Sequence, residues 1–452
     1  MTLKAIVLAA GKGEKIAPFG LTRPKTMIPI GNKPLILHIL EGLKSIGIND
    51  VIIVIGHLGR QVVNCVERIK EKLKVNTTYV RQREPRGTAD AILEAKDLID
   101  DDFLVVYGDV LTSKKTYEVI LKKFEESGAY VVISVAKPEE AEHRFTASLE
   151  GDKVTKLTWW GEGVKVAGMY AFVKEAINYI ERNPGIMRSS VIGIMPPIEA
   201  ELNQSISEMI RDGKEVLAIE VQEYFEDLDF PWNILHANMK YYKHIAKDLR
   251  SSKIGKDVEI SEKAVIKAPI VVGDCSKIGD NVVITKPTFI GRNSRVDHGA
   301  IIEGGMIGDN TVVEKYCEVR AILGNNVRVG HAAEVFGVVF DKVYIVHYSE
   351  VTGVIGENTD IGAGTLVGTL RFDSEKPIVR VKRKKYVAES VAYIGDYCRT
   401  GVGAMIMPGV RVGPYSIVGP GVVLYEDLEP YKMVLVRQEL VKRDWGPNRY
   451  GW

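Results

Sequence analysis

Residues 272–291 read VGDCSKIGDNVVITKPTFIG, and an aliphatic residue followed by glycine occurs three times in this stretch. The intervals between these pairs are six residues or a multiple of six. A short strand and a turn fit into six residues, so three such units can close one triangular coil with stacked aliphatic side chains inside. The stretch therefore predicts a parallel β-helix.

The same pair recurs through much of the second half of the chain. The aliphatic members that precede a glycine are Ile254, Val272, Ile278, Ile290, Ile307, Leu323, Val329, Ile355, Ile361, Ile394, Val402, Val412 and Val418. We expect the β-helix to span residues 253–424, followed by a tail over residues 425–452. The repeats are interrupted at residues 371–390, where basic residues gather. Such a polar segment should protrude from the coil as a loop.

The first 240 residues follow a different pattern, in which short apolar runs alternate with helical segments. Strands are expected at Ala5–Ala9, Val51–Ile55, Thr77–Arg81 and Phe103–Tyr107, and helices at Pro34–Ile46, Gln61–Lys74 and Ala89–Leu98. This alternation indicates an α/β, Rossmann-like domain with a mostly parallel sheet, whose ligands bind beyond the carboxyl ends of the strands. Residues 241–252 are expected to form a short linker helix between the two parts.

The composition narrows the possible partners and compartments. Lys plus Arg number 60 and Asp plus Glu 59, which gives a formal charge of +1 and no global field to attract nucleic acid or an anionic membrane. The four cysteines are far apart, with no CxxC pair, which argues against a zinc knuckle and a disulfide framework. The apolar runs are short of the roughly 20 residues of a membrane helix. The residues after Met1 resemble a strand rather than a signal peptide. We expect a cytoplasmic protein.

A glycine loop follows the first predicted strand. Its candidate nucleotide ligands are Leu8, Ala9, Ala10, Gly11 and Gly13. Small residues at this position let backbone N–H groups approach phosphate oxygens closely. The motif PKTMIP at residues 24–29 then brings the ammonium group of Lys25 to the same loop. Together the two motifs predict a phosphate site.

These motifs resemble the signature of the sugar-1-phosphate nucleotidylyltransferase family, in which LAAGxGxR is followed by PKxxxP. Further matches come in the family's order. Gln82 and the GTA at residues 87–89 resemble its base-recognition strand and the turn after it. The YGDV at residues 107–110 resembles the segment with its first metal aspartate, and the EDLDFPWN at residues 226–233 the segment with its second. The resemblance covers essentially residues 1–240.

The resemblance implies a transfer of a nucleotidyl group from a nucleoside triphosphate to a sugar 1-phosphate, with pyrophosphate as the leaving group. Asp109 and Asp227 would hold Mg²⁺. Lys25 would hold the sugar phosphate or the α-phosphate, and Lys15 the β- and γ-phosphates. Guanylyl-transferring relatives tend to carry a carboxylate near the position of Gln82, so we expect UTP or dTTP. The remaining candidates are Gly87 and Thr88 for the nucleotide and Gly168 and Glu201 for the second substrate.

The chain departs from the family pattern mainly on the sugar side. Lys15 stands where the family usually has Arg, and the two cations are not equivalent toward phosphate. The family's Glu-Lys-Pro is replaced by Trp159-Trp160-Gly161, its Asn by Val166, and an upstream Tyr-Gly by Arg144-Phe145. These changes imply either a different sugar or a loss of activity in this half.

Residues 250–424 resemble the left-handed β-helix of hexapeptide-repeat acyltransferases. The whole chain thus resembles the bifunctional enzymes, especially the archaeal ones, that pair uridylyl transfer with acetylation of an amino-sugar phosphate. His347, in the VHYSEV at residues 346–351, matches the family's general base, which takes a proton from the amine as it attacks acetyl-CoA. The alternative is a coil-corner histidine without chemistry. The resemblance also implies a homotrimer.

The acyltransferase match has departures of its own. Asp297 stands in place of a phosphate-binding Arg, Phe336 in place of a Lys, and Thr369 in place of an Asn. The basic cluster Arg380–Lys385 either binds coenzyme A phosphates or is simply solvated.

A second interpretation of the chain belongs to another class: a catalytically silent regulatory or assembly subunit, like the nucleotide-exchange subunits of a translation initiation factor. The altered sugar side favours it, whereas the intact glycine loop, Lys25, Asp109 and Asp227 favour an enzyme. The enzyme interpretation requires these last three side chains to lie close enough to share one ligand.

Overall fold

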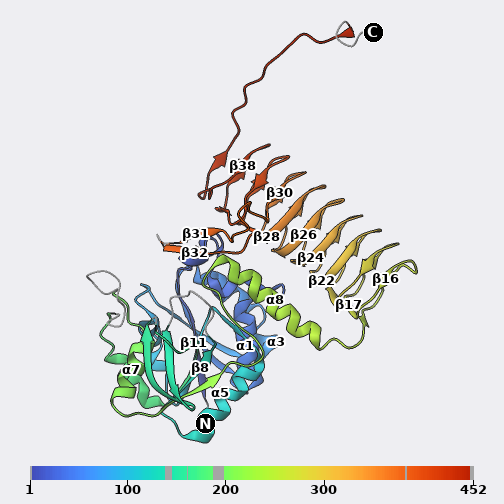
Figure 1. Cartoon of the computed structure of the whole chain (residues 1–452). Coiled ribbons are helices and arrows are strands. Elements are labelled where there is room, and N and C mark those ends of the chain that lie inside the picture. The colour runs from blue at the N-terminus through green and yellow to red at the C-terminus, as the bar shows by residue number, and fades with distance from the viewer. Residues whose placement is uncertain (1–2, 138–144, 160, 187–197, 382–383, 448–452) are drawn as a thin grey trace.

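The computed structural model describes residues 3–137, 145–159, 161–186, 198–381 and 384–447. They form an α/β domain and a β-helix that lie against each other, with helix α8 (Pro231–Lys247) between them (Figure 1). Both parts agree with the fold class that the sequence predicts.

The α/β domain is built on a nine-stranded sheet with the order β5-β4-β1-β6-β11-β8-β12-β10-β9. The strands are β1 (Lys4–Ala9), β4 (Asp50–Ile55), β5 (Asn76–Arg81), β6 (Phe103–Tyr107), β8 (Val131–Ala136), β9 (Phe145–Glu150), β10 (Lys153–Trp159), β11 (Val164–Phe172) and β12 (Val216–Glu220). Strands β5, β4, β1 and β6 pair in parallel, as predicted. β10 and β11 run antiparallel to their neighbours, whereas the other seven strands of the sheet point in one direction.

Helices cover both faces of this sheet, as the alternation of strands and helices predicts. They are α1 (Leu35–Ser45), α2 (Gly59–Glu67), α3 (Lys70–Leu73), α4 (Thr88–Leu93), α5 (Lys114–Ser127), α6 (Ile177–Glu181) and α7 (Leu202–Arg211). Ala5 and Val7 of β1 face the core that contains α1 and α5, whereas Ile6 faces the core that contains α4 and α7. The helix predicted at Gln61–Lys74 is divided into α2 and α3, and α3 buries none of its side chains.

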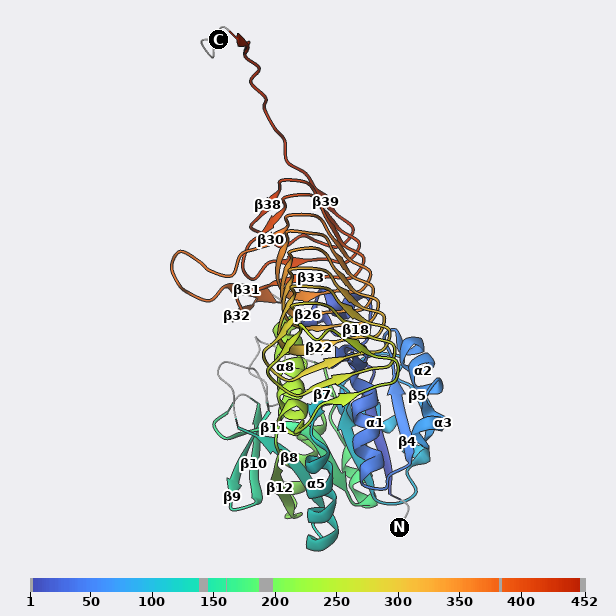
Figure 2. The same cartoon turned by 90° about the vertical axis from the view of Figure 1, so that its right-hand side faces the viewer.

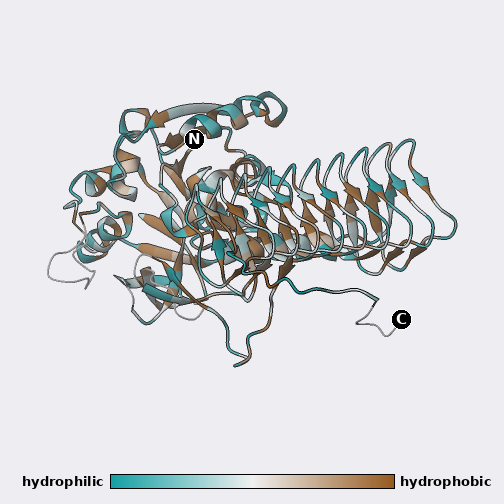
Figure 3. Cartoon of the chain, turned by 90° about the horizontal axis from the view of Figure 1, so that it is seen from above, coloured by the Kyte–Doolittle hydropathy of each residue, from teal (hydrophilic) through white to brown (hydrophobic). Residues whose placement is uncertain are grey.

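The β-helix consists of stacked coils whose strands form long parallel ladders. One ladder runs from β14 (Lys253–Ile254) to β38 (Val423–Leu424), and a second runs from β15 (Glu259–Ile260) to β39 (Met433–Val434). Buried aliphatic side chains such as Ile278, Ile345 and Ile361 fill the interior, and hydrophobic and hydrophilic residues alternate along the coils (Figure 3). The six-residue period predicted this arrangement. The second ladder continues past Leu424 into the segment expected to be a tail.

Side-chain oxygens at one corner of the β-helix bind successive coils together. Each oxygen accepts a hydrogen bond from a backbone N–H of the preceding coil, at 2.6–2.8 Å. We call these residues the corner column: Asp274, Asp309, Asn325, Asp341 and Asp396. Since Asn325 does the same work as its aspartate neighbours, one side-chain carbonyl oxygen is enough to hold a coil.

The insertion at residues 371–390 is excluded from the coils, as predicted, but part of it does not protrude. Strands β31 (Ile378–Val381) and β32 (Lys384–Val387) form an antiparallel hairpin at the boundary with the α/β domain (Figures 1 and 2). Val379 and Val381 are buried in the core that they share with α1 and α8. The prediction of a wholly protruding loop is wrong because these alternating valines give the hairpin an apolar face. Lys382 and Arg383 lie outside the described residues.

Helix α8 joins the two parts and begins earlier than the sequence predicts, at Pro231 rather than Tyr241, and it ends at Lys247. Pro231 suits the first turn of a helix, where its missing N–H is not needed. The backbone N–H of Phe230 donates to Asn233 Oδ1 at 2.7 Å, which caps the same turn. Tyr242 of α8 donates its hydroxyl hydrogen to the carbonyl oxygen of Pro287 in the β-helix at 2.7 Å.

Among the described residues, none of the helices combines the length and the apolar character that crossing a bilayer requires. The last described segment, beyond β39, extends away from the end of the β-helix (Figure 1), and Leu440, Val441 and Trp445 in it are exposed. The end of the tail, residues 448–452, lies outside the described residues.

We expect Gly337 to be a position where the coil stacking tolerates no side chain. Its φ is +120°, and a Cβ there would lie 2.2 Å from the carbonyl oxygen of Gly353 in the next coil. Gly421 also has a positive φ of +66°, but nothing lies within 4 Å of its Cβ position. Gly421→Ala should therefore cost only the backbone strain of about 1–2 kcal/mol, and Gly337→Ala clearly more. Thermal unfolding followed by circular dichroism measures both, and equal falls in the melting temperature would contradict the prediction.

Candidate active site

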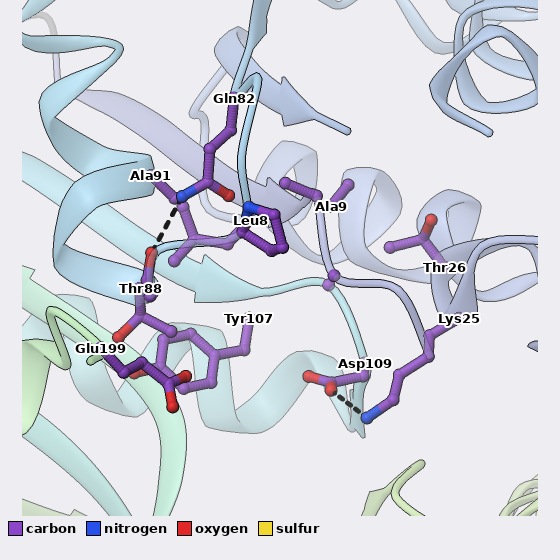
Figure 4. Close-up of a pocket in the computed structure, with 15 residues that line it drawn as sticks. Leu8, Ala9, Lys25, Thr26, Gln82, Thr88, Ala91, Tyr107, Asp109 and Glu199 are labelled. Carbon is purple, nitrogen blue, oxygen red and sulfur yellow. Dashed lines mark hydrogen bonds and ion pairs between the residues drawn. The ribbon is translucent and has the colours of Figure 1, made fainter. Parts of the chain in front are cut away.

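A cavity of about 240 Å³ lies beyond the carboxyl ends of β1 and β6. It brings together most of the predicted nucleotide ligands with the predicted lysine and the first predicted metal aspartate (Figure 4). The predicted residues that line it are Leu8, Ala9, Ala10, Gly11, Lys25, Gln82, Gly87, Thr88 and Asp109. Gly13 is not among the lining residues. It has a φ of +64°, and a Cβ there would lie 3.4 Å from Cγ of Lys25, so it lies beneath the lysine side chain instead.

The register of the sheet places the glycine loop beside Asp109. Leu8 of β1 pairs with Tyr107 of β6, and the N–H of Gly108 donates to the carbonyl oxygen of Leu8 at 2.9 Å. A Cβ at Gly108 would lie 2.4 Å from Cγ2 of Thr26, so the lack of a side chain lets the PKTMIP segment approach the strand end. Asp109 then extends toward Lys25 from the end of β6 (Figure 4).

Gln82 lies at the opposite side of the cavity and has one end of its amide fixed. Its Nε2 donates to the carbonyl oxygen of Gly87 at 3.1 Å and to Oδ2 of Asp90 at 2.8 Å. Because both partners are acceptors, the orientation of the amide is determined. Its Oε1 is then the atom that can accept a hydrogen bond from a ligand.

Lys25, Asp109 and Asp227 converge, as the enzyme interpretation requires. Lys25 Nζ lies 2.8 Å from Asp109 Oδ2, and one carboxylate oxygen from each of Asp109, Asp227 and Asp229 lies within 4.8 Å of the other two. Asp229 Oδ1 is 3.1 Å from Lys25 Nζ, and Asp229 Oδ2 is 3.4 Å from Lys15 Nζ. The three carboxylates and the two ammonium groups therefore form one compact cluster.

Two members of this charged group were missed by the sequence reasoning. Asp229 follows Asp227 by two residues, a spacing that puts both side chains on one side of an extended segment and could have revealed it. Lys165 lies within β11, and its Nζ is 3.4 Å from Asp227 Oδ2. The signal for Lys165 was a lysine inside an otherwise apolar strand, since lysine is rarely buried without a partner.

A second cavity of about 170 Å³ adjoins the first and shares Tyr107 and Asp109 with it. Both predicted ligands of the second substrate, Gly168 and Glu201, line this cavity, as do Lys15, Lys165 and Asp227. The residues that depart from the family pattern are here as well, since the lining includes Phe145, Trp159 and Val166. The altered sequence thus changes the wall of one particular cavity. Arg144 and Trp160 lie outside the described residues.

Burial and nearby charges shift the pKa values of Asp227 and Asp229 in opposite directions. Burial, together with the charges of Asp229 and Asp109, raises the pKa of Asp227 to about 7 against the opposing effect of Lys165. Burial would also raise the pKa of Asp229, but Lys25 and Lys15 outweigh it and hold that pKa well below its usual range. Burial would lower the pKa of Lys25, yet its carboxylate neighbours raise it, so the ammonium group stays charged.

The predicted residues of the β-helix are not gathered in one place. His347 is exposed at a corner, with its ring centroid 5.1 Å from that of Tyr348. Asp297 forms an ion pair with Arg295 at 2.8 Å. Phe336 and Thr369 line a cavity of about 560 Å³ between α8 and the β-helix, to which Arg320 contributes a cation that the sequence reasoning missed. His347 is not among the residues that line this cavity.

Different protein-family profiles match the two parts of the chain. The profile of the family described as Nucleotidyl transferase matches residues 4–158. In the β-helix, the profile of the GMPPB C-terminal domain matches residues 250–340, and that of the Bacterial transferase hexapeptide (six repeats) matches residues 392–426.

Curated relatives are similar along nearly their whole length. The "Bifunctional protein GlmU" of Methanococcus maripaludis is 30% identical, over 97% of this chain and 98% of that protein. The protein of the same name from Methanocaldococcus jannaschii is 30% identical, over 98% and 99%. The "Bifunctional sugar-1-phosphate nucleotidylyltransferase/acetyltransferase" of Sulfurisphaera tokodaii is 29% identical, over 94% and 98%.

Glu201 should give the free energy of unfolding a recognisable pH dependence. Burial raises its pKa to about 7, although hydrogen bonds such as that from the Asn203 N–H favour the ionised form. A carboxyl group whose pKa is higher in the folded than in the unfolded state contributes stability fully below its unfolded pKa, and this contribution is lost as the pH rises through 7. Glu201→Gln stays neutral, so wild type should lose about 2–3 kcal/mol relative to this variant between pH 5 and pH 8.

Chemical denaturation at several pH values measures this difference. Glu208→Gln is the matched control, because Glu208 lies in helix α7, which Glu201 caps, and is only partly buried; it should leave the pH profile unchanged. A wild-type-minus-variant difference for Glu201→Gln that is flat with pH would contradict the prediction.

Proposed function

The chain belongs to the family of bifunctional sugar-1-phosphate nucleotidylyltransferase/acetyltransferases, and we propose that its α/β domain transfers a nucleotidyl group from UTP or dTTP to a sugar 1-phosphate, with release of pyrophosphate. One observation carries the proposal: Lys25 and Asp109 line the first cavity, and Asp109 and Asp227 line the second. A catalytically silent subunit would have no need to keep these charges together. The names of the full-length relatives favour the enzyme as well.

The two cavities suit the two substrates of such a transfer. The nucleoside triphosphate would occupy the cavity of the glycine loop, and the sugar 1-phosphate the cavity lined by Gly168 and Glu201. A phosphate oxygen of the sugar then attacks the α-phosphorus in line. The protein contributes by positioning and charge stabilisation. Lys25, at the junction, would stabilise the charge that develops on the α-phosphate.

Lys15 and Lys165 supply further positive charge from the second cavity. The family resemblance assigns Lys15 to the β- and γ-phosphates, and its position beside Asp229 keeps it near the meeting point of the two cavities. Lys165 lines only the second of the two cavities. We therefore assign it to the phosphate of the sugar substrate, where it would replace the lysine that the family's Glu-Lys-Pro segment provides.

The carboxylates fit Mg²⁺, a hard cation that prefers oxygen ligands. Asp109 and Asp227 would hold the ion, with Asp229 close enough to take part. The raised pKa of Asp227 reflects burial beside negative charges, a condition that a cation relieves. When bound, Mg²⁺ supplies charge neutralisation for the phosphates.

The fixed amide of Gln82 supports a uracil or thymine base. Its Oε1 can accept a hydrogen bond from the imide N–H that both bases carry, whereas N3 of cytosine has no hydrogen to donate. Gln82 thus supports UTP or dTTP without separating the two.

For the β-helix we propose transfer of an acetyl group from acetyl-CoA to the amine of an amino-sugar 1-phosphate, with His347 as general base. His347 is exposed and lies outside the cavity lined by Arg320, so a single β-helix does not enclose it. A homotrimer, in which a neighbouring copy supplies the missing wall, would complete such a site.

The described cysteines form no disulfide, which supports assignment to the reducing cytoplasm.

The proposed transfer predicts pyrophosphate release from UTP or dTTP with Mg²⁺ and one or more members of a panel of sugar 1-phosphates. Lys25→Ala should lower kcat by about 10²–10³-fold, because it removes a charge that stabilises the transition state. Lys165→Ala should raise the KM of the sugar 1-phosphate by roughly tenfold, the effect of losing one charged hydrogen bond, and leave the KM of the nucleotide unchanged.

Lys156→Ala is the matched control for Lys165→Ala, because Lys156 is an exposed lysine on strand β10 of the same sheet. It should leave kcat and both KM values unchanged. Wild-type protein that neither releases pyrophosphate with any member of the panel nor binds UTP or dTTP would remove the transferase proposal.

The proposed acetylation predicts that acetyl-CoA is consumed in the presence of glucosamine 1-phosphate. His347→Ala should reduce the rate by about 10²–10⁴-fold, the usual contribution of a general base. His298→Ala, at the same corner of the β-helix but outside the matching motif, should retain the rate. If the wild type consumes no acetyl-CoA, or if both variants behave alike, the role of His347 is refuted.

A further inference from the structure

The segment between Lys15 and Lys25 lies directly on the β-helix. We propose that an ion pair between Arg23 and Asp396 positions Lys25, so that the β-helix holds part of the nucleotidyl-transfer site in place. This inference rests on the proposed function of the α/β domain and extends it by naming a positioning residue in the other part of the chain.

Arg23 is held by groups of the β-helix. Its Nη2 lies 2.6 Å from Asp396 Oδ2 and 3.3 Å from Glu357 Oε2. The side chain of Asp396 is 0% exposed and that of Arg23 13%. The guanidinium group also lies over the ring of Phe340, 5.0 Å from its centroid. An ion pair with so little solvent access is screened weakly and fixes the geometry of its partners.

Neighbouring residues reinforce this contact. The hydroxyl group of Thr22 donates to Asp396 Oδ2, and the ring of Phe19 packs against Phe340 with centroids 5.4 Å apart. From the α/β domain, Gln61 Nε2 donates to the carbonyl oxygen of Thr22 at 2.8 Å. The segment is thus fixed from both sides.

The path from Arg23 to the charged group of the active site is short and stiff. Only Pro24 separates Arg23 from Lys25, and its ring fixes φ, here at −62°. Lys25 then contacts Asp109 and Asp229 at 2.8 and 3.1 Å. The same segment also supports the glycine loop, because a Cβ at Gly20 would lie 2.1 Å from the carbonyl oxygen of Gly13. A displacement of Arg23 would therefore be passed on to the lysine ammonium group.

Asp396 divides its two oxygens between two tasks, which makes a clean substitution available. Oδ1 holds the coil through the N–H of Glu357 at 2.6 Å, as in the rest of the corner column, and Oδ2 faces Arg23. Asn325 shows that an amide oxygen performs the first task. Asp396→Asn should therefore keep the coil and remove the charge that binds Arg23.

The test is made on the full-length chain. Arg23→Ala and Asp396→Asn should each lower kcat for pyrophosphate release by about 10–100-fold, the cost of a misplaced catalytic group, and change the KM of the nucleotide much less. The double variant should lose little more than Arg23→Ala alone, since both substitutions break one contact. Arg23→Lys should recover part of kcat. Asp341→Asn, two coils away in the corner column, is the matched control and should leave kcat unchanged.

A second measurement does not depend on activity. Hydrogen exchange of the full-length chain, read by mass spectrometry, should show faster exchange over residues 21–28 in Arg23→Ala and Asp396→Asn, with no change in strand β6. Wild-type kcat in the folded variants, or unchanged exchange over residues 21–28, would overturn the proposal. If the wild type itself transfers no nucleotidyl group, the proposed function fails, and the exchange result alone decides whether Asp396 fixes the lysine segment.

Discussion

The mutual repulsion of three carboxyl groups in a small, partly buried space is the constraint on which the α/β domain depends. One carboxylate oxygen from each of Asp109, Asp227 and Asp229 lies within 4.8 Å of the other two, and charges of one sign this close require nearby cations or the uptake of a proton. Lys15 and Lys25 provide two cations from one segment, and Lys165 provides a third from β11. Together the three lysines and three carboxylates form a nearly balanced cluster, which offers oxygen ligands and ammonium groups side by side.

Sequence patterns predicted the elements whose signals are local. The six-residue period fixed the β-helix, and a glycine loop next to PKTMIP located the first cavity, since both motifs follow directly from short-range geometry. Asp229 could have been found from its two-residue spacing to Asp227, whereas Lys165 was missed because its partner is far away in the chain. Lys165 reaches Asp227 only after β11 has been placed in the sheet, and no spacing in the sequence specifies that neighbour.

The boundary between the α/β domain and the β-helix was also predicted only in part from sequence patterns. The segment containing Arg380–Lys385 was judged by its charge, yet the alternation of Val379 and Val381 decided its position, because one face of the hairpin is apolar. The early start of α8 likewise depends on Asn233 capping the N–H of Phe230. In both cases a pattern of two or three residues outweighed the overall composition of the segment.

The corner column gives the β-helix possible attachment points at a regular spacing. Successive coils are separated by the strand spacing of about 4.8 Å, and an aspartate at the corner needs only one oxygen to hold its coil, so the other can face outward. Arg23 contacts the column at Asp396 and also reaches Glu357 in the preceding coil. The gain or loss of one coil between Asp396 and α8 would leave the coil repeat intact. It would nevertheless move the partner of Arg23 by one strand spacing relative to the α/β domain. The number of coils on that side is therefore set by the neighbouring domain and not by the β-helix itself.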